Sequence, residues 1–170
     1  MTEAEQDIKI EDAPASLYGW KESDKVIHIT KEAYSSIISQ AQKDAPIESC
    51  GYTLGEVDEN GEILITHNYP LTNIDHSEEH FSMAPKEQFA ALKYARQNAL
   101  KVIGNWHSHP ASPSRPSEED KRLALDPNTL YLICSLSPGL SGSPNVPAGQ
   151  PVINAFRIVN GEVTRFPVIV

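Results

Sequence analysis

The hydrophobic positions of the chain change repeatedly between strand-like and helix-like spacing. Short apolar runs bounded by Gly, Pro, Asn or Asp predict strands, and apolar residues that recur every three or four positions predict amphipathic helices. We predict strands at 26–29, 50–55, 62–66, 101–106, 130–135, 153–159 and 162–170, and helices at 30–45, 86–100 and 117–125. Mixed elements with several hairpins and no internal repeat indicate one α/β or α+β layered domain.

Local signals define where several of these elements begin and what they bury. Thr30 is a suitable N-cap for the first helix, and Asn160-Gly161 is a strong type I′ turn signal for the closing hairpin. The helix that follows Pro85 offers several large residues to the core. These are Phe89, Leu92, Tyr94 and Ala95.

Two stretches lack a periodic pattern and are predicted to lie outside the regular elements. Residues 1–25 are polar and acidic, apart from Leu17, Tyr18 and Trp20, and are expected to form a mobile extension with a weak aromatic anchor. Residues 137–149 are rich in Ser, Gly and Pro and are expected to form an exposed loop. The domain itself is therefore predicted to span residues 26–170.

Composition limits the classes of partner and compartment. The formal net charge is −9, and the fourteen basic residues form no cluster, which disfavours nucleic acid and anionic membranes. No apolar run is long enough to span a membrane, and the N-terminus does not read as an export signal. The two cysteines, Cys50 and Cys134, are then expected to be reduced thiols in a cytoplasmic protein.

Candidate metal chemistry is concentrated after the strand at 101–106. On an extended backbone His107 and His109 point to the same face, about 6–7 Å apart at Cα, which suits two imidazoles on one ion. A proline-braced loop then returns Asp120 from the first turn of the next helix. Two imidazoles and one carboxylate form a three-ligand zinc set that leaves one position for water, as in hydrolases.

Each of these residues also has a simpler explanation when taken alone. Ser117 and Asp120 fit a variant capping box, and a single His-x-His pair in a strand is more often incidental than metal-binding. The combination of His107, His109 and Asp120 favours zinc. Glu48 is the candidate general base, although composition does not select it and an exposed glutamate after a helix-ending proline is ordinary.

Two further patterns are interpreted as incidental. The pentapeptide from His76 to His80 fits H-x-x-E-H, but that motif needs a long apolar helix and this one lies in a polar stretch between prolines. Cys50 is flanked by glycine and an apolar strand, which favours a buried structural thiol over a nucleophile.

The chemistry-bearing residues resemble the signature of the JAMM (MPN+) metalloproteases. Glu48-Ser-Cys-Gly lies far upstream of His107-Ser-His-Pro, which is followed by six residues, Ser117, two residues and Asp120. Similarity extends to Asn73, Phe81 and Pro85 before the second helix and to the late strands at 131–135 and 155–158. Residues 26–170 are covered by the resemblance, and all five signature positions are intact.

The resemblance implies a fold and a role for each of these residues. It implies a cytidine-deaminase-like mixed sheet flanked by helices, with one zinc ion held by His107, His109, Asp120 and water. Glu48 would move a proton from that water to the leaving amine, and Ser117 would donate a hydrogen bond to the developing oxyanion. The reaction would be hydrolysis of a peptide or isopeptide bond.

The compact chain most resembles the short bacterial branch of this family. Such proteins act at the Gly-Gly tail of ubiquitin-like, β-grasp sulfur carriers in sulfur amino-acid or cofactor biosynthesis. The tail would bind as an added strand, and the loop at 137–149 is a candidate groove wall. Two alternatives stay open, a non-catalytic MPN interaction scaffold and a hydrolase of small amides or free peptides. Whether the chain is a monomer or a homodimer also stays open.

Overall fold

The structure is a computed structural model, which describes residues 19–137 and 150–170. Its strands are β1 (Lys21–Glu22), β2 (Ile27–Ile29), β3 (Cys50–Val57), β4 (Ile63–Leu71), β5 (Lys101–His109), β6 (Leu130–Ser135), β7 (Val152–Val159), β8 (Glu162–Phe166) and β9 (Val168–Ile169). Its helices are α2 (Lys31–Asp44), α3 (Pro85–Gln97) and α4 (Glu118–Leu123).

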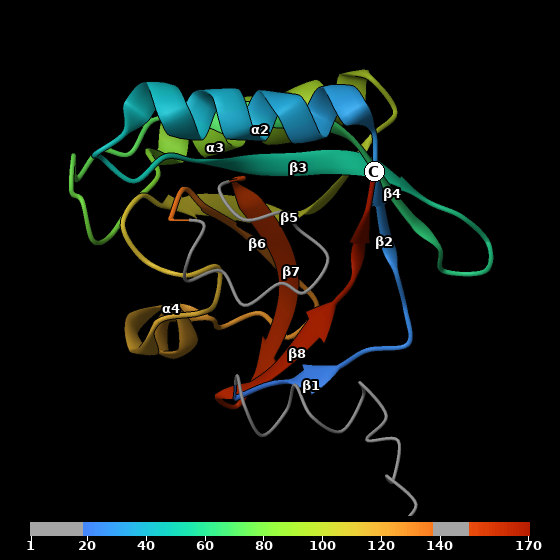
Figure 1. Ribbon diagram of the computed structural model, residues 1–170. Coiled ribbons are helices and arrows are strands. Elements are labelled where there is room, and N and C mark those ends of the chain that lie inside the picture. The colour runs from blue at the N-terminus through green and yellow to red at the C-terminus, as the bar shows by residue number, and fades with distance from the viewer. Residues whose placement is uncertain (1–18, 138–149) are drawn as a thin grey trace, which may run out of the picture.

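All the strands named above belong to one mixed sheet. Its order is β1-β8-β7-β6-β5-β3-β4-β2-β9, with parallel pairing of β5 with β6 and antiparallel pairing of β3 with both β4 and β5. β8 and β9 lie near opposite ends of this order although Pro167 alone separates them in the chain. The sheet must therefore curl until its two ends approach each other, as Figure 1 shows.

Helices cover both faces of the curled sheet. α2 buries Ala33, Ile37 and Ala41 in the main core, together with residues of β2, β4, β5, β6 and β7. α3 packs on the other face, where Ala91 joins Cys50 and Leu71. α2 packs mainly against β4, and Figure 1 shows α4 apart from both other helices. The sheet thus separates the α2 side from the face on which α3 lies.

The close pairing of β5 with β6 depends on a glycine. A Cβ atom built on Gly104 would lie 1.9 Å from the carbonyl oxygen of Leu130, which no side chain can occupy. Gly104 pairs with Leu130 at the start of the parallel ladder, and the same ladder places His107 opposite Ile133 and His109 opposite Ser135. This glycine therefore helps to set where the two histidines lie.

The predicted order of elements agrees with the structure, with differences in extent. β5 continues through His109, and the predicted strand at 162–170 is divided by Pro167 into β8 and β9. Asn160 and Gly161 have φ values of 51° and 80°, as a type I′ turn requires.

The predicted burial of the second helix is wrong for its largest residues. Phe89 is 71% exposed and Leu92 is 49% exposed, whereas the small residues Ala91 and Ala95 face the sheet. Because α3 lies close on β4 and β5, its inner face accepts alanines and turns the bulky side chains outward. Helical periodicity located the helix but not the face that is buried.

The N-terminal segment joins the sheet earlier than we predicted. Trp20 is 4% exposed and packs edge-on against Phe156, and β1 pairs in parallel with β8. Residues 20–22 are thus packed on the domain, ahead of the boundary expected at residue 26. Most of the predicted extension (1–18) and of the predicted loop at 137–149 lies outside the described residues.

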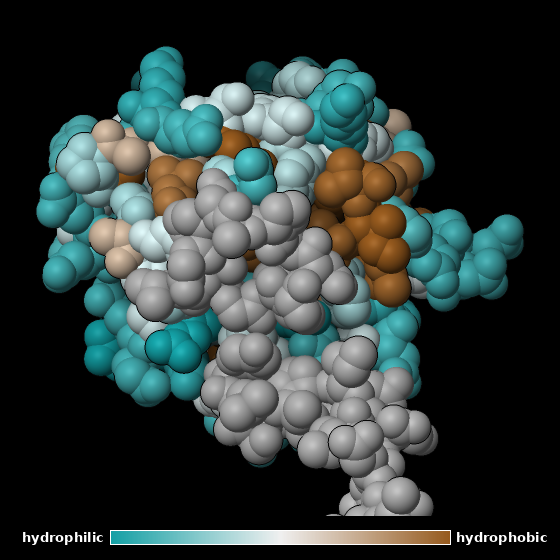
Figure 2. Space-filling model, in the orientation of Figure 1, coloured by the Kyte–Doolittle hydropathy of each residue, from teal (hydrophilic) through white to brown (hydrophobic). Residues whose placement is uncertain are grey.

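Surface hydrophobicity is concentrated at the C-terminal end of the chain on the face drawn in Figure 2. A hydrophobic area lies where this end meets β2 and β4. The last two residues of the chain, Ile169 and Val170, are both exposed. Among the helices of the described residues, none has the length and apolar character needed to cross a bilayer.

Candidate metal centre

The two histidines converge at the end of β5. His107 and His109 are 2% and 5% exposed, and their Nε2 atoms lie 3.0 Å apart. Strand alternation places both rings on one face, while Trp106 and Ser108 point to the other. Trp106 is fully buried in the core, as its position in the strand predicts.

Hydrogen bonding determines which ring nitrogen of His109 faces the centre. Its Nδ1 lies 2.8 Å from the carbonyl oxygen of Pro113, so Nδ1 carries the hydrogen and donates it. The lone pair of a neutral His109 is then on Nε2, next to His107 Nε2. This is how metal-binding histidines are usually oriented, with the outer nitrogen donating to a backbone or carboxylate oxygen.

Asp120 completes the cluster from the first turn of α4. Its Oδ1 lies 3.2 Å from His107 Nε2 and its Oδ2 lies 3.3 Å from His109 Nε2. Asp120 also forms the capping box, because Ser117 N–H donates to Oδ2 and Asp120 N–H donates to Ser117 Oγ. The Asp120 carboxylate therefore both caps α4 and joins the cluster with the two histidines. One atom from each of the three residues lies within 4.8 Å of the others, a spacing that can hold a metal ion.

The loop between His109 and Asp120 is tied to the sheet by buried hydrogen bonds. Ser114 is fully buried and donates through Oγ to the carbonyl oxygen of Ile133 at 2.6 Å. Asn154 of β7 donates through Nδ2 to the carbonyl oxygen of Ser114 at 3.0 Å. Ser135 Oγ donates to the carbonyl oxygen of Ser112 at 2.7 Å. These bonds restrict the path along which Asp120 returns to the histidines.

A longer chain of contacts connects this loop to the N-terminal segment. Arg165 donates from Nη1 to Asn154 Oδ1 at 3.1 Å and pairs through Nε with Glu22 at 2.6 Å. Both charged side chains are almost buried, at 12% and 11% exposure. A buried ion pair of this kind contributes to stability mainly when its remaining donors and acceptors are hydrogen-bonded. Asn154 accepts a hydrogen bond from one of the remaining Arg165 donors.

Glu48 lies just before β3, within electrostatic reach of His109 and Asp120. It is 5% exposed, and the charges of His109 and Asp120 are close enough to shift its pKa. Ser49, its neighbour, donates its N–H to Ser108 Oγ at 2.7 Å, and Ser108 N–H donates to the carbonyl oxygen of Ser49 at 2.9 Å. This reciprocal pair connects the glutamate segment directly to the strand that carries the histidines.

The loop between β4 and α3 covers both Glu48 and His107. Asn73 is 6% exposed and donates through Nδ2 to the carbonyl oxygens of Glu48 and His80, each at 3.0 Å. In the same loop Phe81 stacks on His107, with ring centroids 4.7 Å apart. The loop therefore supports the glutamate and covers one face of a histidine.

Burial and neighbouring charges shift the pKa values of the four ionisable groups. Burial raises the pKa of Glu48 to about 8, with smaller raising effects from acidic neighbours and an opposing effect from His109. Burial also lowers the pKa of His107. For His109 burial acts to lower the pKa, but hydrogen bonds to Asp120 and Pro113 outweigh it and raise the pKa. For Asp120 burial opposes ionisation, yet hydrogen bonds from both histidines hold its pKa well below the usual range.

The structure brings His107, His109 and Asp120 together, and it does not form a site from either of the two incidental patterns. Ser117 is exposed at the start of α4, with Asp120 beside it. His76 and His80 lie in an irregular loop without the helix that an H-x-x-E-H site requires. Cys50 is fully buried, and burial raises the pKa of its thiol to about 12, which supports a structural role.

Several supporting residues were not predicted from the sequence. Asn154 and Ser108 are buried polar residues inside apolar strands, a signal that could have identified them. The stacking of Phe81 on His107 had no local signal, because the residues come from a loop and a strand far apart in the chain.

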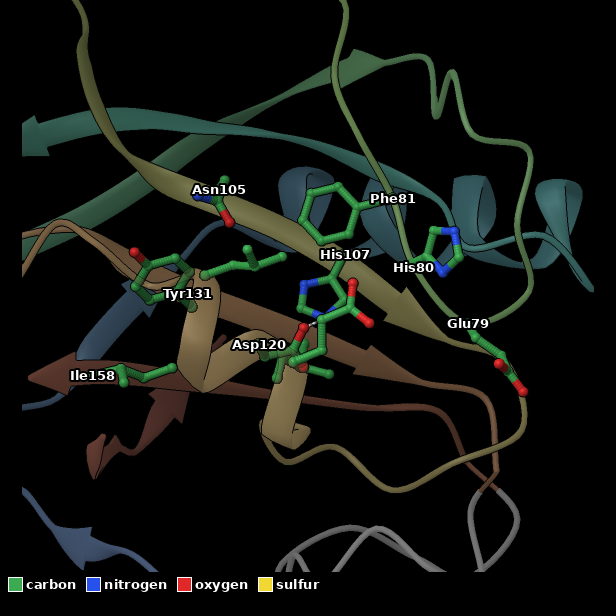
Figure 3. Close-up of a pocket in the computed structure, with 11 residues that line it drawn as sticks. Glu79, His80, Phe81, Asn105, His107, Asp120, Tyr131 and Ile158 are labelled. Atoms are coloured by element: carbon green, nitrogen blue, oxygen red, sulfur yellow. Dashed lines mark ion pairs between the residues drawn. The ribbon is translucent and has the colours of Figure 1, made fainter. Parts of the chain in front are cut away.

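A pocket of about 170 Å³ opens beside His107 and Asp120. Figure 3 shows His107 and Asp120 at its centre, with Glu79 and His80 toward one end and Asn105, Tyr131 and Ile158 toward the other. Two residues of the cluster, His107 and Asp120, therefore line a space that a small group could enter.

The donor set fits a divalent transition metal. Two imidazole nitrogens and a carboxylate oxygen are typical zinc ligands, and the carboxylate lacks a balancing cation unless a histidine is protonated or a metal is bound. The site and fold together define a mixed α/β protein with a three-residue cluster that could hold a metal ion.

The chain belongs to the family of prokaryotic homologs of the JAB domain, which matches residues 30–147. It is 28% identical over 144 residues to the CysO-cysteine peptidase of Mycobacterium tuberculosis, covering 84% of this chain and 90% of that protein. It is 30% identical over 114 residues to a desampylase of Haloferax volcanii, covering 64% and 80%.

Solved structures agree with this assignment. A protein of Desulfitobacterium hafniense has a TM-score of 0.72 and 41% identity, covering 85% of this chain and 92% of that one. A JAB1/MPN domain protein from Archaeoglobus fulgidus has a TM-score of 0.50 and 17% identity, covering 86% and 100%, which supports the fold alone. The predicted family and fold class are confirmed.

Proposed function

We propose that the chain is a zinc-dependent peptidase or isopeptidase of the JAB family. It hydrolyses a bond at or after the C-terminal Gly-Gly tail of a ubiquitin-like, β-grasp sulfur carrier, in sulfur amino-acid or cofactor biosynthesis. The observation that carries the proposal is the convergence of His107, His109 and Asp120, with buried Glu48 within electrostatic reach. The names of the matched relatives, a CysO-cysteine peptidase and a desampylase, support a substrate of the carrier type.

In this proposal, one zinc ion is held by His107 Nε2, His109 Nε2 and a carboxylate oxygen of Asp120. When bound, zinc supplies Lewis acidity that makes a water molecule more acidic and polarises a carbonyl group. The protein contributes the orientation of these ligands through Pro113 and the capping box. A scaffold without catalysis would not need this complete set, which favours the enzymatic alternative.

Glu48 is the proposed general base and then general acid. Its carboxylate takes a proton from the attacking water and delivers it to the nitrogen of the leaving amine. Burial raises its pKa to about 8 in the metal-free protein, which suits a group that must both accept and release a proton near neutral pH. The Ser49–Ser108 hydrogen bonds hold its backbone next to β5.

Ser117 is the proposed oxyanion donor. Its Oγ already accepts the N–H of Asp120 at 3.0 Å, which orients the oxygen and leaves its hydroxyl hydrogen available. A hydroxyl that donates to the developing oxyanion contributes about 3 kcal/mol in the transition state. Ser117 is exposed and is held beside Asp120 by the capping box, which supports this role.

The decisive test is Glu48→Gln in the full-length protein. We expect the variant to keep about one zinc per chain while turnover of a tailed carrier protein falls by about three orders of magnitude, since only the proton carrier is lost. Metal analysis and product detection by mass spectrometry measure the two quantities. Glu59→Gln, in an exposed turn, is the matched control and should leave both unchanged. Normal turnover by Glu48→Gln would contradict the proposal.

The substrate class is tested by offering three kinds of bond to the wild-type protein. One is a β-grasp carrier with an amino acid after Gly-Gly, one is the same carrier joined to a lysine side chain, and one is a small amide. Cleavage of either carrier supports the proposal and identifies the bond as peptide or isopeptide. Cleavage of the small amide alone would instead favour the small-amide hydrolase.

A further inference from the structure

One end of the pocket extends past His107, away from the metal ligands. It is formed by Asn105 on β5, Tyr131 and Ile133 on β6 and Ile158 on β7. Figure 3 shows Asn105, Tyr131 and Ile158 grouped at this end, beyond His107. Apolar walls with few polar atoms are typical of a subsite that binds one part of a substrate.

Two buried polar atoms among the residues that line this pocket lack a hydrogen-bond partner in the described part of the chain. They are Asn105 Oδ1 and His107 Nδ1. An unsatisfied buried donor or acceptor costs about 1–3 kcal/mol, so native proteins rarely keep two together without a use. Both atoms belong to the same strand and the same face, two residues apart.

The two atoms have complementary roles. Asn105 Oδ1 is an acceptor only, and His107 Nδ1 carries a hydrogen whenever its Nε2 binds a cation, which makes Nδ1 a donor. An acceptor and a donor on the same face of one strand can pair with the N–H and C=O groups that an extended peptide presents along its length. The pair is therefore suited to main-chain recognition.

The position of Glu48 indicates which part of the substrate enters this end. The leaving amine must approach Glu48 to receive its proton, yet Glu48 does not line this pocket. Glu48 instead lines a separate cavity between α2 and residues 70–76. The pocket at Asn105 is thus on the acyl side of the bond, where the residues that precede Gly-Gly lie.

We propose that Asn105 is a specificity-determining residue. Its Oδ1 accepts a hydrogen bond from the main-chain N–H of the substrate residue that precedes Gly-Gly. The carbonyl oxygen of that same substrate residue accepts a hydrogen bond from His107 Nδ1–H. The side chain of that residue packs on Ile133 and Ile158. This inference rests on the proposed function, because it places the Gly-Gly tail at the metal centre. It predicts that the enzyme distinguishes carriers by the residue before Gly-Gly as well as by the tail itself.

The test uses a hexapeptide that ends in Gly-Gly, with or without an N-methyl group on the residue before Gly-Gly. Binding is measured by calorimetry to the zinc-loaded full-length Glu48→Gln variant, which cannot turn the peptide over. We expect N-methylation to weaken binding about tenfold, since it removes one hydrogen-bond donor. When Asn105→Ala is added, the methyl group should change binding less than twofold.

The controls separate recognition from folding. Asn60→Ala, at an exposed turn, should keep the tenfold effect of the methyl group, and Asn105→Leu should behave like Asn105→Ala with zinc content unchanged. If N-methylation weakened binding equally whether residue 105 is Asn or Ala, this inference would be overturned and the proposed function would stand. Absence of any peptide binding by the zinc-loaded protein would overturn the inference together with the Gly-Gly specificity.

Discussion

The two sides of the metal centre are built in different ways. The ligand side is one short segment, in which His107, His109 and Asp120 lie within fourteen consecutive residues of a strand, a loop and a helix. The glutamate side is assembled from distant parts of the chain. Ser49 and Ser108, which connect it to β5, are 59 residues apart.

The two sides are also stabilised by different contacts. The loop between His109 and Asp120 is held by hydrogen bonds to β6 and β7. These bonds involve Ser114, Ser135 and Asn154. Glu48 is held by Ser108 on β5 and by Asn73 of the loop before α3. Because the two sides share few contacts, a substitution that disrupts one side should leave the other side in place. We expect the ligand side to control metal affinity and the glutamate side to control turnover.

Asn73→Ala should produce the largest effect on stability and should act on the glutamate side. The change removes hydrogen bonds to the carbonyl oxygens of Glu48 and His80 and leaves those groups unpaired near the protein interior. We expect a loss of about 3 kcal/mol in the free energy of unfolding, measured in urea. Turnover should fall about tenfold or more while the zinc dissociation constant changes less than twofold. If zinc affinity fell by the same factor as turnover, the two sides would not be independent.

The stability of the metal-free protein should depend on pH through Glu48. Its pKa rises from an ordinary 4.5 to about 8 in the folded chain, so the folded state binds more protons than the unfolded state between these values. Stability that is present at low pH is therefore lost as the pH rises through this window. Glu48→Gln should remove this part of the slope. A slope between pH 5 and pH 8 identical to that of the wild type would contradict the raised pKa.

Asn154→Ala should give the smallest effect and should act on the ligand side. Without Asn154 the carbonyl of Ser114 loses its donor and the loop to Asp120 gains freedom. We expect zinc to bind about tenfold more weakly, as the loss of one outer hydrogen bond typically causes. The zinc-saturated variant should keep turnover within about twofold, because Glu48 is unaffected. Competition with a chromogenic chelator measures the affinity. Unchanged affinity would show that the loop holds its position without β7.

Sequence reasoning succeeded where the relevant geometry is local. Strand alternation places His107 and His109 on one face whatever the rest of the chain does, and the S-x-x-D spacing forms a capping box within one helical turn. The turn at Asn160-Gly161 is local in the same sense. Composition alone did not identify Glu48 as the general base. That prediction depended on the resemblance to a family signature.

Tertiary structure decided the features that depend on how distant elements pack. The exposure of Phe89, the stacking of Phe81 on His107 and the docking of Trp20 against Phe156 all follow from which surfaces meet. A periodic pattern shows that a helix has two faces, but the space left by the sheet decides that α3 buries alanines. The amino-acid order thus determined the cluster of His107, His109 and Asp120, because one strand and one turn suffice to orient these side chains. Only packing decided what surrounds those ligands, because these contacts join residues that the chain itself keeps far apart.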